Sequence, residues 1–173
     1  MDIKLIALDV DGVLTDGKLL IGSNGVEYKS FNVKDGMGIS LARFSGIKIA
    51  IITGRKSESV NIRSKELNVD FLYEAIKNKK EVLMKLVSLL NINMKNVFFM
   101  GDDINDLSVI QSVGFSAAPK DAVELVKNSV SFVSKYKSGE GAVREAIDYV
   151  LYNQHNYELL IKQYLQEEAM LTQ

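Results

Sequence analysis

Short apolar runs that alternate with helical patterns constrain this chain more than any other feature of its sequence. The runs are nearly continuous in apolar residues, as in strands that are buried on both faces of a parallel sheet. They occupy residues 3–10, 47–52, 70–73, 96–100 and 114–118, and the helical patterns occupy 36–44, 57–67, 79–90, 105–112, 122–127 and 142–151. The alternation predicts an α/β fold, a doubly wound, Rossmann-like and mostly parallel sheet of five or six strands with helices on both faces.

Residues 18–33 interrupt this alternation and predict a β-hairpin insertion. Two strand-like arms, 18–21 and 26–33, flank a turn at 22–25 that is rich in Gly and Asn. This composition is typical of hairpin turns. The insertion lies between the first strand and the first long helix.

Composition excludes several classes of function. The chain has 173 residues and a formal net charge of −1, which gives no basic field for nucleic acid. It has no cysteine and a single histidine, His155, which excludes thiolate and His-rich zinc sites and disfavours a Ser-His-Asp triad. No apolar run reaches the roughly 18 residues of a membrane span, so we expect no membrane partner and a cytoplasmic location. The length suits one main domain, at 1–151, followed by a helical tail at 152–173.

Acidic residues end two of the predicted strands. Asp9 and Asp11 end the first strand, and Asp102 and Asp103 end the fourth. Residues i and i+2 share a face if the strand continues that far, and parallel strands end at one edge of the sheet, so these carboxylates should gather there. A hard divalent cation would relieve their repulsion, and oxygen ligands favour Mg²⁺ over zinc. An Asp after a strand more commonly caps a helix or turn. This alternative applies most to Asp103, which could also orient another residue.

Two further features suit a phosphoryl group at the same edge. Thr53 and Gly54 end one strand and offer a hydroxyl donor and a free N–H before a helix. Lys79 and Lys80 begin the next helix, where a cation is unfavourable in the field of the helix dipole. An ordinary surface lysine is the alternative, but one lysine directed at an anion would explain the placement.

Together these residues resemble the motifs of the haloacid dehalogenase superfamily of phosphohydrolases. Residues 9–15 resemble its first motif, Thr53 its second, Lys80 its third and residues 101–106 its fourth, in the same order. Over residues 3–151 the chain further resembles the capless subfamily of 3-deoxy-D-manno-octulosonate 8-phosphate phosphatases, through segments 31–38 and 139–145.

The resemblance implies covalent catalysis with Mg²⁺ as the cofactor. Asp9 would attack phosphorus to form an aspartyl phosphate. Asp11 would protonate the leaving alcohol and then activate the water. Asp9, the backbone carbonyl of Asp11, and Asp102 would hold the magnesium.

The remaining motif residues would act around this centre. Lys80 aligns better than Lys79 and is therefore the expected catalytic lysine. The residues expected to offset phosphoryl charge are Thr53, Gly54 and Lys80. Asp103 and Asp106 are expected to orient the lysine and the metal ligands without contacting the substrate.

The gaps between the motifs leave no room for a cap domain. The resemblance therefore implies an open site that takes its lid from a neighbouring subunit, in a homotetramer whose hairpins meet at the centre. Leu19, Leu20 and Ile21 give the hairpin an apolar surface to bury, which fits an interface.

The resemblance also implies a small-molecule sugar-acid phosphate as the substrate. Arg offers a planar fork for a sugar carboxylate, although each cation taken singly more often lies on a solvated surface. Related phosphatases of nine-carbon sugar acids carry Glu at the position of Arg55, so Arg55 favours the eight-carbon octulosonate. The candidate substrate-binding residues are Lys34, Asp35, Gly36, Gly54, Arg55, Arg63 and Arg144.

Three alternatives remain open. The first is a phosphatase of a nonulosonate 9-phosphate. The second is a receiver-like signalling domain, which would carry an acceptor Asp where this chain has Thr53. The third is an inactive oligomerisation module, which should have lost Asp9 or Asp11, and both are present.

Overall fold

The main sheet has six strands, and every neighbouring pair is parallel. The computed structural model describes residues 1–171, and residues 172 and 173 of the predicted tail lie outside that part. The strand order is β5-β4-β1-β6-β7-β8, with β1 at Leu5–Leu8, β4 at Lys48–Ile52, β5 at Phe71–Tyr73, β6 at Val97–Met100, β7 at Phe115–Ala118 and β8 at Phe132–Val133. The predicted doubly wound, Rossmann-like fold is confirmed.

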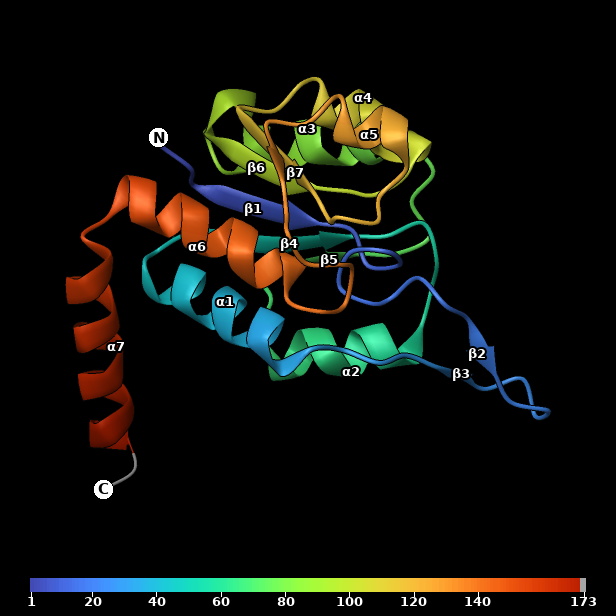
Figure 1. The fold of residues 1–173 in the computed structure, drawn as a ribbon, viewed down its shortest axis with the longest axis horizontal. Helices are drawn as coiled ribbons and strands as arrows, with labels where there is room; N and C mark the ends of the chain where they lie inside the picture. The colour runs from blue at the N-terminus through green and yellow to red at the C-terminus, as the bar shows by residue number, and fades with distance from the viewer. Residues whose placement is uncertain (172–173) are drawn as a thin grey trace.

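Helices cover both faces of this sheet (Figure 1). One face carries α1 (Val33–Phe44), α2 (Glu58–Glu66) and α6 (Ala142–Gln154), and the other carries α3 (Lys79–Leu89), α4 (Leu107–Ile110) and α5 (Glu124–Lys127). Short 3-10 turns, η1 at Met94–Asn96 and η2 at Ile104–Asp106, precede β6 and α4. Ile6 and Leu8 of β1 pack toward α1 and α6, whereas Leu5 and Ala7 pack toward α3. Burial on both faces explains why the strands are continuous apolar runs.

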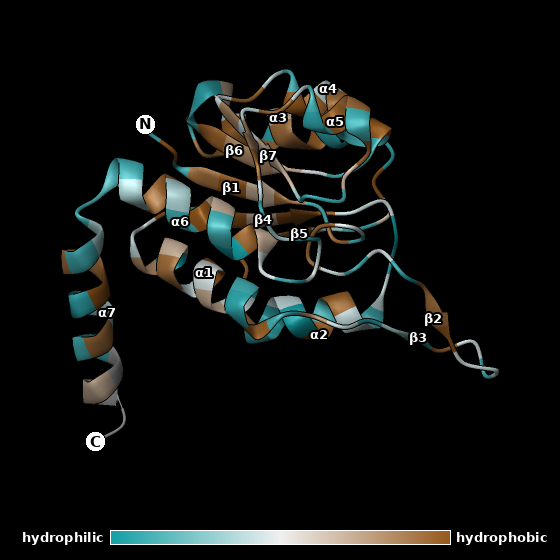
Figure 2. Cartoon of the chain, in the orientation of Figure 1, coloured by the Kyte–Doolittle hydropathy of each residue, from teal (hydrophilic) through white to brown (hydrophobic). Residues whose placement is uncertain are grey.

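The predicted hairpin is present but shorter than expected. β2 (Leu20–Ile21) and β3 (Glu27–Tyr28) pair antiparallel and project from the body of the domain (Figure 1). Figure 2 shows the apolar colour of β2 on this projection. The predicted arm to residue 33 is wrong, because α1 begins there: the side chain of Asn32 accepts a hydrogen bond from the amide of Lys34 at 2.8 Å and caps the helix.

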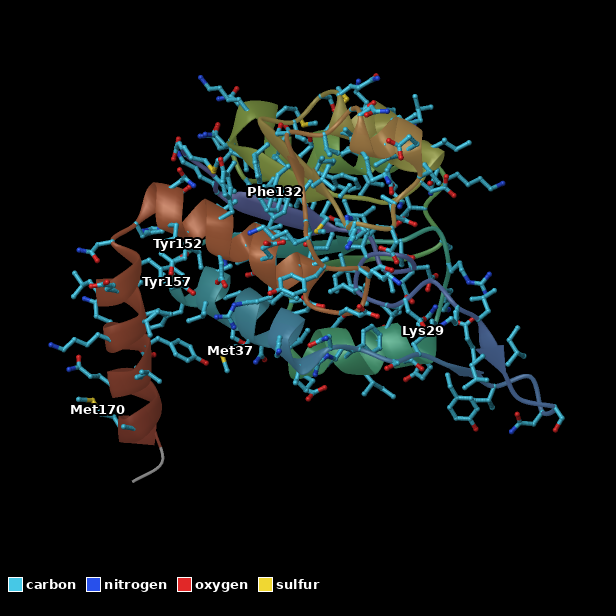
Figure 3. The ribbon with its side chains drawn as sticks, viewed as in Figure 1. Lys29, Met37, Phe132, Tyr152, Tyr157 and Met170 are labelled. Atoms are coloured by element: carbon cyan, nitrogen blue, oxygen red, sulfur yellow. The ribbon has the colours of Figure 1, made fainter. Side chains whose placement is uncertain are left out.

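The tail forms a helix, α7 at Tyr157–Leu171, which turns away from α6 and packs beside α1. Phe44 and Tyr164 make an edge-to-face contact with ring centroids 5.3 Å apart. The rings of Tyr152 and Tyr157 stack at the corner between α6 and α7 (Figure 3). α6 runs past residue 151, and the division into a main domain and a tail at that residue stays a prediction. Within the described residues, no helix is long and apolar enough to cross a membrane.

Candidate active site

Three strand ends meet at one edge of the sheet. The amide of Asp9, just after β1, donates to the carbonyl of Met100, the last residue of β6, at 3.1 Å. On the other side of β1, Leu8 pairs with Ile51 of β4, so Thr53 lies one residue further along the strand direction than Asp9. The ends open into a pocket of about 280 Å³. Its lining residues are Asp9, Asp11, Gly17, Thr53, Gly54, Arg55, Asp102, Asp103 and Asn105.

Asp11 reaches this pocket from a turn and not from a continued strand. β1 ends at Leu8, and the carbonyl of Val10 accepts hydrogen bonds from amides of the following turn. The same-face argument for residues i and i+2 therefore does not apply. Gly12 has φ of +83°, and a Cβ there would lie 2.0 Å from Oδ2 of Asp102. Glycine thus allows the turn to approach the carboxylate of Asp102.

The lysine that contacts Asp9 is Lys79 and not Lys80, the one expected from the sequence. Nζ of Lys79 lies 2.6 Å from Oδ2 of Asp9 and 2.7 Å from Oδ1 of Asp106, and the side chain is only 3% exposed. Asn78 caps α3, which begins at Lys79. Successive helical residues are about 100° apart around the axis. Only one of the two lysines can therefore face the strand ends, and the position of the cap decides which.

Asp106 is fully buried and connects Lys79 to the loop after β6. Its Oδ1 accepts from Lys79, and its Oδ2 accepts from the amide of Asp102 at 3.2 Å. A Cβ on Gly101 would lie 2.4 Å from Oδ2 of Asp106, so only glycine allows this approach. Asp103 accepts from the amide of the next residue at 2.7 Å, which is the capping role that the sequence left open for it.

Burial and neighbouring carboxylates raise the pKa values of Asp9 and Asp102. Burial raises the pKa of Asp9 to about 6, with Lys79 opposing the change and Asp106 adding to it. Burial raises the pKa of Asp102 to about 7, and Asp9 and Asp106 add to it. Burial lowers the pKa of Lys79, but the two carboxylates outweigh it, so the net shift is upward and the ammonium stays charged.

The same carboxylates can hold a metal ion. One oxygen each from Asp9, Asp102 and Asp106 lie within 4.8 Å of one another. All three donors are hard oxygens, the ligand type of Mg²⁺. A divalent cation there would relieve the repulsion that raises the pKa values of Asp9 and Asp102.

Two hairpin residues, Lys29 and Glu27, belong to the site and were missed by the sequence analysis. Nζ of Lys29 forms an ion pair with Oδ1 of Asp11 and lies 3.0 Å from Oε1 of Glu27. A guanidinium nitrogen of Arg55 lies 2.6 Å from Oε2 of Glu27. The signal was the alternation of charged and apolar residues at the start of this arm. It places Glu27 and Lys29 on one face and Tyr28 on the other.

Five predicted substrate-binding residues do not line this pocket. Lys34 and Arg144 border a separate pocket of about 440 Å³. Asp35 is buried, and its Oδ1 accepts from the amide of Arg144 at 2.8 Å, so it joins the starts of α1 and α6. A Cβ on Gly36 would lie 2.5 Å from a guanidinium nitrogen of Arg63, which makes Gly36 a packing residue. Gly54 and Arg55 do line the pocket, and a part for the other five residues in substrate binding stays a prediction.

Comparison with known proteins gives relatives over most of the chain. A model of the haloacid dehalogenase-like hydrolase family matches residues 63–147. The 3-deoxy-D-manno-octulosonate 8-phosphate phosphatase KdsC of Escherichia coli K12 is 44% identical over 150 residues, which are 87% of this chain and 80% of the relative. The crystal structure of the Moraxella catarrhalis phosphatase of this name, in complex with magnesium, phosphate and KDO, has a TM-score of 0.91 at 36% identity and covers 94% of each chain. A cobalt-bound phosphatase of this kind from Haemophilus influenzae has a TM-score of 0.85 at 35% identity, over 88% of this chain and 90% of that one.

The parallel sheet, the carboxylates at its strand ends and these relatives show that the chain belongs to the haloacid dehalogenase-like hydrolases. Within this family it is similar, over most of its length, to the 3-deoxy-D-manno-octulosonate 8-phosphate phosphatases, which are phosphoric monoester hydrolases.

Proposed function

We propose that this chain is a magnesium-dependent phosphatase that releases phosphate from 3-deoxy-D-manno-octulosonate 8-phosphate. The observation that carries the mechanism is the buried contact of Asp9 with Lys79 at the base of an open, acidic pocket. The 44% identity to the Escherichia coli enzyme supports the substrate. Arg55 borders the same pocket and offers a cation for the carboxylate of a sugar acid.

The donors at the strand ends fit magnesium. Asp9 and Asp102 offer carboxylate oxygens, and the backbone carbonyl of Asp11 is the third protein ligand in this proposal. Asp106 is less suited as a ligand, because its two oxygens already accept from Lys79 and from the amide of Asp102. When bound, Mg²⁺ supplies positive charge that offsets the phosphoryl oxygens.

The residues of the chain divide the reaction between them. The carboxylate of Asp9 attacks phosphorus, and the bond from phosphorus to the sugar oxygen breaks while Asp11 delivers a proton to that oxygen. Asp11 then takes a proton from water, the water oxygen attacks phosphorus, and phosphate leaves with Asp9 regenerated. Lys79 offsets charge on the transferring group. The hydroxyl oxygen of Thr53 accepts from the amide of Arg55 at 3.4 Å, which leaves its proton free to donate to a phosphoryl oxygen.

The assembly we propose is a cytoplasmic homotetramer in which a neighbouring subunit covers the pocket. The support is the projecting hairpin, where Leu19, Leu20, Ile21, Val26 and Tyr28 are exposed in the single chain. A cluster of exposed apolar side chains of this kind is typical of an interface.

A panel of phosphate monoesters tests the activity. We expect hydrolysis of the octulosonate 8-phosphate with Mg²⁺, and loss of it with EDTA or with Asp9→Asn. Activity that survives both treatments contradicts the mechanism. Comparable turnover of glucose 6-phosphate would contradict the proposed substrate. Faster turnover of a nonulosonate 9-phosphate would identify that compound as the substrate instead.

A further inference from the structure

We propose that Lys29 is a positioning residue for the known class of reaction: it anchors one oxygen of the Asp11 carboxylate and leaves the other without a hydrogen-bond partner among the described residues. The inference rests on the proposed acid-base role of Asp11. It assigns a purpose to a buried cation that lies on the hairpin, outside the motifs of the strand ends.

The two oxygens of Asp11 have different surroundings. Oδ1 is held by the ammonium of Lys29, and the hydroxyl of Thr15 lies 3.5 Å from the same oxygen. Oδ2 is buried in the single chain and accepts no hydrogen bond from the described residues, and the nearest cation recorded for it is Nε of Arg55 at 3.8 Å. One oxygen is therefore anchored, while the other has no hydrogen-bond partner among the described residues and is the one that can bond to the leaving oxygen and later to water when substrate enters. Such an arrangement suits a group that must deliver a proton in a defined direction.

The burial of Lys29 makes this contact hard to replace by solvent. Its side chain is only 1% exposed. A buried ammonium is stable only when it is paired, and its partners are Asp11 and Glu27. Removal of Lys29 would leave Asp11 without its anchor and free to rotate.

The contact also connects the acid-base residue to the hairpin. Lys29 lies directly after β3, at the base of the hairpin (Figure 3). Glu27 fixes the same strand to the body, through its side chain with Arg55 at 2.6 Å and through its carbonyl with the hydroxyl of Ser59 at 3.3 Å. A movement of the hairpin can therefore shift the carboxylate of Asp11 through the side chain of Lys29.

The first test compares Lys29→Met with Lys29→Arg, and with Lys18→Met as the matched control. Lys18 lies on the other arm of the hairpin and its side chain is 84% exposed. We expect Lys29→Met to lower kcat/KM for the sugar phosphate roughly tenfold or more, with unchanged affinity for Mg²⁺. Lys29→Arg should restore part of the loss, and Lys18→Met should behave as the parent enzyme. Parent-like kcat/KM in Lys29→Met overturns the proposal.

The leaving group separates positioning from general damage. Para-nitrophenolate leaves without needing a proton, so Lys29→Met should lower kcat/KM much less for para-nitrophenyl phosphate than for the sugar phosphate. In single-turnover experiments, the double variant Lys29→Met/Asp11→Asn should react at nearly the same rate as Asp11→Asn alone, because both changes act through the carboxylate of Asp11. Equal losses on both substrates, or additive losses in the double variant, overturn the proposal.

Failure of the inference can be told apart from failure of the proposed function. If Asp11→Asn keeps full activity, the acid-base role is wrong. If Asp11→Asn is impaired and Lys29→Met is not, only the positioning role is wrong. Should Lys29→Met fail to fold, Lys29→Gln removes the charge and keeps a hydrogen-bond donor toward Asp11. It should give a smaller loss with the same dependence on the leaving group, and a loss independent of the leaving group overturns the proposal.

Discussion

Lys79 and Asp9 form a buried ion pair, with Nζ 2.6 Å from Oδ2, where the start of α3 meets the end of β1. Lys79→Met should lower kcat by about a hundredfold or more, because the transferring phosphoryl group loses its fixed cation. Lys80→Met is the matched control, one position further along α3, and should stay within about twofold of the parent enzyme. Steady-state kinetics of the two variants decide between the lysines, and a larger loss in Lys80→Met would reverse the assignment.

Stability of the metal-free protein should fall as pH rises from about 4 to about 7. Folding raises the pKa of Asp9 from 3.8 to about 6 and that of Asp102 from 3.8 to about 7. Across this window the folded state binds more protons than the unfolded state, so each deprotonation costs stability. Mg²⁺ binds the deprotonated carboxylates, so it should raise Tm more at pH 8 than at pH 5.

Thermal scans with EDTA and with Mg²⁺ over this pH range check that expectation. Asp102→Asn removes one titrating group and should flatten the pH dependence of the metal-free protein. An equal Mg²⁺ effect on Tm at every pH would show that these carboxylates do not bind the ion.

Gly12→Ala should cost both stability and metal binding. The backbone at this residue has φ of +83°, and the new Cβ would meet Asp102 at 2.0 Å. Gly46→Ala is the control, since Gly46 has φ of +90° and no atom within 4 Å of a Cβ. Both variants should lose about 1–2 kcal/mol through backbone strain. Titration of Tm with Mg²⁺ should show weakened binding in Gly12→Ala alone, and normal binding there would contradict the role of the glycine.

Ile21→Glu should dissociate the proposed tetramer. Ile21 on the hairpin and Ile62 on α2 are each 59% exposed in the single chain, so Ile62→Glu is a control of equal exposure. A buried glutamate in the interface would be costly, whereas the same change on α2 should leave the assembly intact. Light scattering gives the mass of each variant. A parent chain that is a monomer contradicts the assembly, and so does an Ile21→Glu variant that stays tetrameric.

The strand ends were predictable from sequence because each depends on a local pattern. A strand buried on both faces shows as an apolar run, and Asp9, Thr53 and Asp102 follow such runs directly. The carboxyl ends of parallel strands lie at the same edge of a sheet, so the position of these residues follows once the strands are known. β8 was not located from the sequence, because it has only two residues, Phe132 and Val133, at the edge of the sheet.

The sequence was less informative in two situations. In one, the partner of a residue lies far away along the chain; in the other, the residue at which a helix begins determines which side chains face the site. The choice between Lys79 and Lys80 depends on the cap at Asn78, which sets the first turn of α3. Lys29 was missed because its ion pair requires the hairpin to fold back over Asp11. Asp35, near the start of α1, did not reveal its partner, the amide of Arg144 on α6.

The central position of β1 has a consequence for synthesis of the protein. β1 pairs on one side with β4, beginning at Lys48, and on the other with β6, beginning at Val97. During translation, the central strand β1 is therefore made long before β6, the second strand with which it pairs. Until β6 emerges, the nascent chain carries an apolar strand with an unpaired edge, which is a target for chaperones and a risk of aggregation. Assembly of the proposed reactive centre thus waits for β6, although Asp9 comes much earlier in the chain.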